Sequence, residues 1–87
     1  MKRILIVEDE AIIRASLKRL LERNDYQVAV AGSVEEAKQQ PLSSFDLVIS
    51  DLRLPGEEGT HMIQLMGDIP VLIMTSYASV ESAVEAM

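Results

Sequence analysis

Short apolar runs alternate along the chain with stretches in which apolar residues recur every three or four positions. Four runs rich in Val, Ile and Leu predict β-strands over residues 2–7, 26–31, 45–50 and 70–75. Helical spacing predicts α-helices over residues 11–23 and 60–66, with Met62, Ile63 and Met66 on one side of the second. A capping box over residues 33–36 predicts a helix to about Gln40, and Ser79 can cap a last helix.

This alternation predicts an α/β fold built on a parallel sheet. Strands separated by single helices pair in parallel through right-handed crossovers, which place helices on both faces of the sheet. The 87 residues are enough for one small domain. We therefore expect a doubly wound parallel sheet of about four strands and four helices.

The composition excludes several classes of protein. The chain has no cysteine, which excludes disulfides and Cys-based zinc sites, and it has no apolar run long enough to span a bilayer. Its net charge of −6 argues against direct contact with nucleic acid, which needs a basic surface. The glycines form neither a dinucleotide-binding motif nor a P-loop. No signal peptide is visible, so we expect a cytoplasmic protein with no membrane contact.

Polar residues follow three of the predicted strands. Glu8, Asp9 and Glu10 follow the first strand, and Asp51 follows the third. Thr75 and Ser76 come at the end of the fourth. Because the carboxyl ends of parallel strands meet at one edge of an open sheet, where ligands bind, we expect these side chains to converge there.

A cluster of carboxylates at one edge suggests metal-assisted phosphoryl chemistry. Like charges repel unless protons or a cation neutralise them, and an all-oxygen site favours Mg²⁺, which shares its remaining positions with phosphate oxygens. Asp51 could then attack a phosphoryl group to form an acyl phosphate, with Thr75 donating a hydrogen bond to it. Alternatively, the acids after the first strand only cap the next helix, Asp51 is a lone loop acid, and Thr75 satisfies backbone groups.

Other residues have structural interpretations. Asp46 lies inside a predicted strand, where we expect a partly exposed structural acid, and His61 lacks a metal-ligand pattern and is expected at the surface. Three methionines are expected to fill the core: Met62, Met66 and Met74. The basic residues of the first helix are expected to form its solvent-facing side: Arg14, Lys18, Arg19 and Arg23.

Three blocks of sequence resemble the receiver domain of bacterial two-component response regulators. They are residues 4–10 (ILIVEDE), 45–56 (FDLVISDLRLPG) and 70–76 (PVLIMTS), and with the order of elements the resemblance spans the whole chain. The third block, together with residues 77–79 and 83–84, looks most like NtrC-like enhancer-binding activators. The resemblance implies a CheY-like fold and a signalling domain, not an enzyme, that assists its own phosphorylation and dephosphorylation.

The resemblance also implies a role for each matching residue. Asp51 would accept a phosphoryl group from a sensor histidine kinase. Mg²⁺ would be bound by Glu8, Asp9, Asp51 and the backbone carbonyl of Arg53. Thr75 would be the switch hydroxyl. The residues at the border of the site would be Glu10, Arg53, Ser76 and Tyr77.

The chain departs from the family pattern at its end. Receivers have five strands in the order 2-1-3-4-5, and residues 1–87 include neither the fifth strand, with its Lys, nor the fifth helix. The apolar fourth strand is then left at the sheet edge, so we expect an incomplete receiver that forms a homodimer or higher oligomer through this strand and the last helix. The alternative hypothesis is a phosphorylation-impaired fragment that acts as a binding or oligomerisation module.

Overall fold

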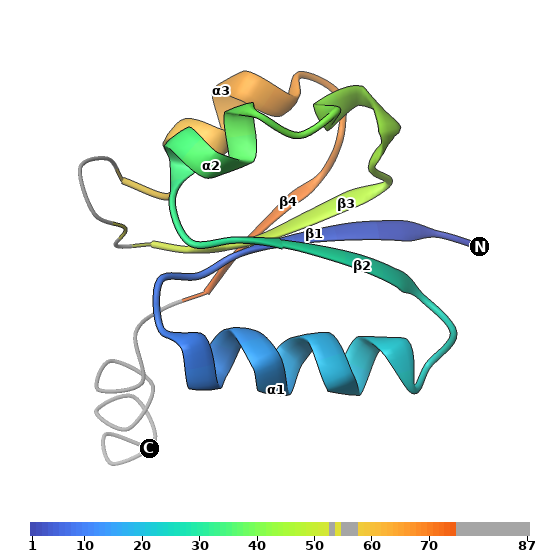
Figure 1. Ribbon diagram of the computed structural model, residues 1–87. Helices are drawn as coiled ribbons and strands as arrows, with labels where there is room; N and C mark the ends of the chain where they lie inside the picture. Colours follow the sequence, from blue (N-terminus) through green and yellow to red (C-terminus); the bar gives the residue numbers. More distant parts are fainter. Residues whose placement is uncertain (53, 55–57, 75–87) are drawn as a thin grey trace, which may run out of the picture.

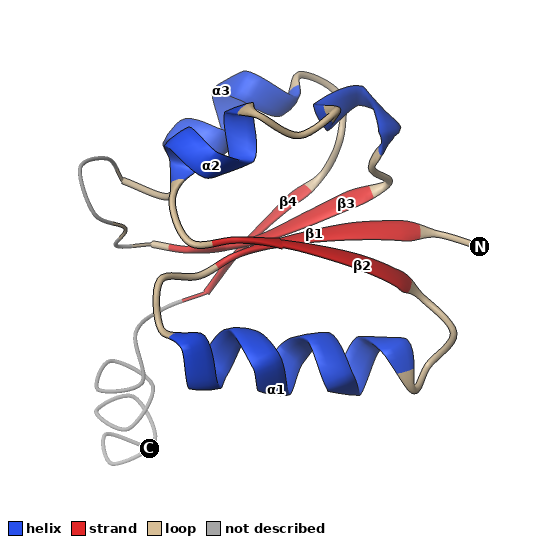
Figure 2. Ribbon diagram, in the orientation of Figure 1, coloured by secondary structure: helices blue, strands red, loops and turns tan. Residues whose placement is uncertain are grey.

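The computed structural model describes residues 1–52, 54 and 58–74, which contain one sheet of four strands. The strands are β1 (Arg3–Val7), β2 (Gln27–Ala31), β3 (Leu47–Asp51) and β4 (Val71–Met74), in the spatial order β2-β1-β3-β4 (Figure 2). All of their pairings are parallel. The predicted class, strand number and strand order are therefore confirmed, while the predicted strand ends differ by one or two residues.

Helices cover both faces of this sheet (Figure 1). α1 (Ala11–Glu22) lies on one face, and α2 (Val34–Lys38), the 3₁₀ helix η1 (Leu42–Ser44) and α3 (His61–Met66) lie on the other. The described residues thus contain three α-helices in a doubly wound arrangement, and the last helix expected after Ser79 lies outside them. No helix in residues 1–52 and 58–74 is long and apolar enough to cross a membrane.

The main hydrophobic core lies between the sheet and the pair α2 and α3. Both the sheet and the helices contribute buried side chains to this core. The sheet contributes Leu5, Val7 and Val48, and the helices contribute Val34, Ala37, Met62 and Met66. Met62 and Met66 are four residues apart on α3 and both face the core, as predicted. Ile63 was expected on the same side but is exposed, because one step along a helix turns the side chain by about 100°.

The face of the sheet that α1 covers is packed less closely. Ile4 and Ile6 alternate with the core residue Leu5, so they point toward α1, and both are buried. α1 itself contains no buried residue. Its inner positions are half-buried, whereas Leu20, which shares their apolar spacing, is exposed. The helix therefore contacts β1 and β2 through a narrow stripe of side chains.

Hydrogen bonds from polar side chains explain where two elements begin. The Asp46 carboxylate accepts the Arg3 backbone N–H at 2.8 Å, so Asp46 is a structural acid, as predicted, and β3 begins just after it. Ser33 Oγ accepts the Glu36 N–H at 3.1 Å and caps α2. The Glu36 carboxylate accepts the N–H of Gly32 rather than that of Ser33, so the predicted capping box closes one residue earlier than expected.

Candidate metal centre

The register of the sheet brings the acidic residues after β1 next to the last residue of β3. Val7 pairs with Ser50, so Glu8 is placed beside Asp51 at the carboxyl edge of the sheet. The backbone N–H of Glu8 still continues the ladder, because it donates to the Ala31 carbonyl at 3.0 Å. The edge predicted from the strand ends is therefore the edge at which these acids lie.

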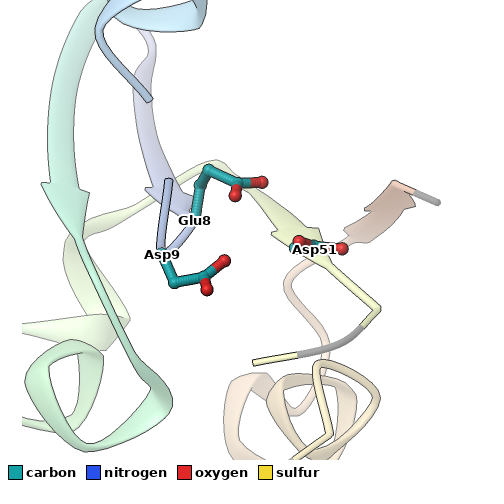
Figure 3. A group of neighbouring side chains, drawn as sticks. All are labelled: Glu8, Asp9 and Asp51. Atoms are coloured by element: carbon teal, nitrogen blue, oxygen red, sulfur yellow. The ribbon is translucent and has the colours of Figure 1, made fainter. Parts of the chain in front are cut away.

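Three carboxylates converge at this edge. One oxygen from each of Glu8, Asp9 and Asp51 lies within 4.8 Å of the others. Figure 3 shows Glu8 and Asp9 reaching from the end of β1 toward Asp51 on β3. Glu8 is 3% exposed and Asp51 is 7% exposed, whereas Asp9 faces solvent. The cluster is thus a partly buried, all-oxygen donor set, which suits a hard cation such as Mg²⁺.

The turn into α1 orients the first two members of the cluster. Glu10 is the residue that caps α1, and its backbone N–H donates to Glu8 Oε1 at 3.0 Å. Its own side chain makes no capping hydrogen bond and is not a member of the cluster. Glu10 therefore borders the site through its backbone, while the carboxylates of Glu8 and Asp9 supply the donor atoms.

The electrostatics of the cluster disfavour a full set of negative charges. Burial raises the pKa of Glu8 from its ordinary value of 4.5 to about 7. This value already includes the hydrogen bond from the Glu10 N–H, which lowers the pKa, and the negative charges of Asp51 and Asp9 and a side-chain hydrogen bond with Asp9, which add to the effect of burial. A divalent cation that neutralises these charges should therefore stabilise the folded chain.

The raised pKa of Glu8 predicts a pH dependence of stability in the absence of divalent metal. Between pH 4.5 and about 7 the folded chain retains a proton on Glu8 that the unfolded chain has released. This proton contributes up to about 3 kcal/mol to the free energy of unfolding. The contribution is fully present below pH 4.5, decreases as the pH rises, and is lost once the pH passes about 7. Urea denaturation in EDTA at pH 5 and pH 8 measures it.

Glu8→Gln is the control for this pH dependence. Glutamine does not ionise but still offers an oxygen to the Glu10 N–H, so the stability difference between pH 5 and pH 8 should shrink relative to the unaltered chain. An unchanged difference in the variant would show that other groups cause the pH dependence.

Two residues near the cluster were not predicted to serve it. Gly59 packs against β3: its N–H donates to the Leu52 carbonyl at 2.8 Å, and a Cβ there would lie 1.7 Å from the Asp51 carbonyl oxygen. Arg14 was expected on the solvent-facing side of α1, but it is half-buried and its guanidinium donates to the Glu8 carbonyl at 2.8 Å. The early position of Arg14 in the helix, six residues after Glu8, was the available sequence signal.

The remaining predicted site residues lie outside the described part of the chain. They are Arg53, Thr75, Ser76 and Tyr77. His61 is exposed on α3, as expected. Met74 was expected in the core but is only half-buried, because it lies at the end of the edge strand β4. The structure therefore brings together the three predicted acids and leaves the hydroxyl side of the site as a prediction.

Comparison with known proteins finds relatives among transcriptional regulatory and response regulator proteins. The chain is 42% identical over 89 residues to the transcriptional regulatory protein ZraR of Escherichia coli K12, which covers 97% of this chain and 20% of ZraR. It is 36% identical over 90 residues to the response regulator protein FleR of Pseudomonas aeruginosa, which covers 98% of this chain and 19% of FleR. The chain thus spans about a fifth of the length of these relatives. The expected similarity to NtrC-like activators is confirmed.

A solved structure and a family description agree with these relatives. The response regulator TrrA of Thermotoga maritima, solved in complex with Mg²⁺ and BeF, superposes with a TM-score of 0.77 at 34% identity over 99% of this chain and 79% of TrrA. Residues 4–87 match the family described as the response regulator receiver domain. With its parallel sheet and the acidic cluster at the expected edge, the chain belongs to the receiver domain family of response regulators.

Proposed function

We propose that this chain is the phosphoacceptor receiver of a two-component response regulator. Asp51 accepts a phosphoryl group from a phosphohistidine of a sensor histidine kinase in a reaction that requires Mg²⁺. The observation that carries this proposal is the convergence of oxygens from Glu8, Asp9 and Asp51 within 4.8 Å of one another. A receiver is a signalling domain and not a classical enzyme, and it assists its own phosphorylation and dephosphorylation.

The proposed reaction is a phosphoryl transfer between two protein side chains. A carboxylate oxygen of Asp51 attacks the phosphorus, the N–P bond of the phosphohistidine breaks, and the electron pair of that bond returns to the imidazole nitrogen. The product is an acyl phosphate on Asp51. When bound, Mg²⁺ supplies positive charge that neutralises the carboxylates and the phosphoryl oxygens.

Each residue of the site has a separate task in this proposal. Glu8 and Asp9 hold Mg²⁺, with Asp51 and the backbone carbonyl of Arg53 as the remaining protein ligands. Thr75 donates a hydrogen bond to a phosphoryl oxygen and acts as the switch hydroxyl, while Ser76 and Tyr77 border the site. Phosphorylation replaces one negative charge by about two and adds acceptor oxygens, which can shift a two-state surface.

Two similarities support the proposal. TrrA, which shares the fold of this chain, was solved in complex with Mg²⁺ and BeF. ZraR is a transcriptional regulatory protein, and on this basis we propose that the response under control is transcription. The acidic net charge supports a chain that makes no direct nucleic-acid contact, and we propose a cytoplasmic location.

Phosphorylation by a small donor tests the proposal directly. Incubation with acetyl phosphate and Mg²⁺ should add acid-stable, base-labile phosphate to the chain, and EDTA should prevent the addition, because the carboxylate cluster otherwise repels the incoming dianion. Mass spectrometry of the intact chain measures the uptake. Mg²⁺ binding without phosphate uptake would identify a phosphorylation-impaired receiver. If the chain neither binds Mg²⁺ nor takes up phosphate, the proposal is overturned.

A second candidate function is association through β4. Leu72, in the middle of this strand, is 56% exposed, and β4 lies at the edge of the described sheet. We propose that the chain associates into a homodimer or higher oligomer through β4 and the helix expected after Ser79. Size-exclusion chromatography with light scattering should show a mass that rises with concentration, and a constant monomer mass would contradict it.

A further inference from the structure

Arg14 differs from Arg19, a second arginine of α1, in its surroundings. It lies in the first turn of the helix and is half-buried, whereas Arg19 on the same helix is exposed. Its Nη1 donates a hydrogen bond to the backbone carbonyl of Glu8 at 2.8 Å, six residues earlier in the chain. A half-buried guanidinium that bonds to a backbone carbonyl fixes that part of the chain more tightly than an exposed one can.

The backbone at Glu8 needs such a restraint. Successive side chains of an extended strand point to opposite faces, yet the carboxylates of the consecutive residues Glu8 and Asp9 both come within 4.8 Å of Asp51. The chain must therefore leave the course of β1 between Glu8 and Asp9. The N–H of Glu8 remains in the ladder, bonded to Ala31 at 3.0 Å, and its carbonyl is turned to Arg14.

The same guanidinium also reaches the loop that joins β2 and α2. A Cβ at Gly32 would lie 3.3 Å from Arg14 Nη1 and 3.2 Å from Glu36 Oε2, so both side chains pack against this glycine. The Glu36 carboxylate is itself held by the Gly32 N–H. Arg14 thus lies where the loop after β1 meets the loop after β2.

We propose that Arg14 is a positioning residue of the metal centre: it holds the Glu8 carbonyl so that the carboxylates of Glu8 and Asp9 face Asp51 together. This inference rests on the proposed function, because it assigns Arg14 to the Mg²⁺ site of that function. Arg14 itself donates no ligand to the metal. Its removal should weaken Mg²⁺ binding in the way that the loss of a hydrogen-bond partner behind a metal ligand does, by about 10-fold or more.

A matched set of variants tests this role. Arg14→Ala removes the hydrogen bond to Glu8, and Arg19→Ala removes the same charge from the exposed side of the same helix. Arg14→Lys keeps the charge but replaces the planar guanidinium by a point charge, so it should restore only part of the Mg²⁺ affinity. Circular dichroism in EDTA checks that each variant is folded.

Titration calorimetry with MgCl₂ gives the dissociation constant of each variant without any phosphodonor. We expect a rise of about 10-fold or more for Arg14→Ala, a smaller rise for Arg14→Lys and less than a twofold change for Arg19→Ala. Equal affinity in Arg14→Ala and Arg19→Ala would overturn the inference and leave the proposed function intact. A failure of the unaltered chain to bind Mg²⁺ would overturn both.

If Arg14→Ala does not fold, two other measurements decide the question. The folded Arg14→Lys variant should still show the weaker affinity, and wild-type affinity in it would overturn the inference. In EDTA, amide hydrogen exchange at Asp9 and Glu10 should be faster in Arg14→Lys than in Arg19→Ala, because the turn between β1 and α1 has lost its restraint. Equal exchange in the two variants would likewise contradict the positioning role.

Discussion

We expect the Asp51→Asn protein to take up no phosphate from acetyl phosphate under conditions in which the unaltered chain is phosphorylated. The neutral amide of asparagine is a poor nucleophile toward phosphorus, whereas the carboxylate of Asp51 offers an oxygen anion at the edge of the sheet. The two side chains have nearly the same shape, so the buried position at the end of β3 should still accept the variant. Intact mass spectrometry after incubation with Mg²⁺ measures the loss.

Asp46→Asn is the matched control for this experiment. Asp46 precedes β3 at the opposite end from Asp51, is exposed, and uses its carboxylate to accept the Arg3 N–H. Asparagine can accept the same hydrogen bond, so stability should change by less than about 1 kcal/mol and phosphate uptake should be unchanged. Phosphate uptake by the Asp51→Asn chain would show that the phosphoacceptor is a residue other than Asp51. Loss of phosphate uptake in the Asp46→Asn chain would contradict the assignment as well.

The Asp51 variant has a second expected property in EDTA. The negative charge of Asp51 contributes to the raised pKa of Glu8, so its removal should lower that pKa toward 4.5. The repulsion inside the cluster then decreases, and the metal-free variant should unfold at a higher urea concentration than the unaltered chain at pH 8. The same change removes a ligand, so Mg²⁺ should stabilise the variant less.

The acidic site could be predicted from the sequence because its residues directly follow or end the strands, whose positions the apolar runs mark. Apolar runs mark the strands, and in a parallel sheet the residues that follow them must meet at one edge. Glu8, Asp9 and Asp51 are therefore expected together from the sequence, and one oxygen of each lies within 4.8 Å of the others. The alternation of strands and helices likewise determined the doubly wound class and, with the family resemblance, the order β2-β1-β3-β4.

Features that depend on contacts between distant elements could not be predicted in this way. Arg14 has the spacing of a solvent-facing residue on α1, and only the meeting of two loops turns it toward Glu8. Ile63 and Leu20 fit the apolar spacing of their helices but are exposed, because each helix buries only a narrow stripe of side chains and these two positions lie outside it. The start of β3 was placed two residues early, since the buried Phe45, with the Arg3 guanidinium 5.0 Å from its ring centre, is apolar without being part of the strand.

Gly59→Ala should have the largest effect on stability of any single methyl group added to a described glycine. The new Cβ would lie 1.7 Å from the Asp51 carbonyl oxygen and 2.9 Å from Ser50 Oγ. A clash with backbone cannot be relieved by a change of rotamer, so the segment around Gly59 must move away from β3, which also breaks the hydrogen bond from Gly59 to Leu52. We expect a loss of at least about 3 kcal/mol, a large part of the stability of a small domain.

The displacement should also reach the acidic cluster, because the carbonyl that the methyl group would strike belongs to Asp51 itself. Urea denaturation followed by circular dichroism measures the stability, and calorimetry with MgCl₂ measures the metal affinity of whatever folded fraction remains. We expect both to fall, since a carboxylate moved by about 1 Å no longer shares a cation well with its partners.

Gly67→Ala is the control that separates the steric clash at Gly59 from the backbone strain that any substitution of a glycine at positive φ causes. Gly67 ends α3 at φ 62°, and a Cβ there would meet nothing within 4 Å. The substitution therefore costs only backbone strain, of order 1–3 kcal/mol, and it lies at the opposite end of α3 from the Gly59 contact, so Mg²⁺ affinity should stay unchanged. If Gly59→Ala were as stable as the unaltered chain and bound Mg²⁺ equally well, the close packing of Gly59 on Asp51 would have no part in shaping the site.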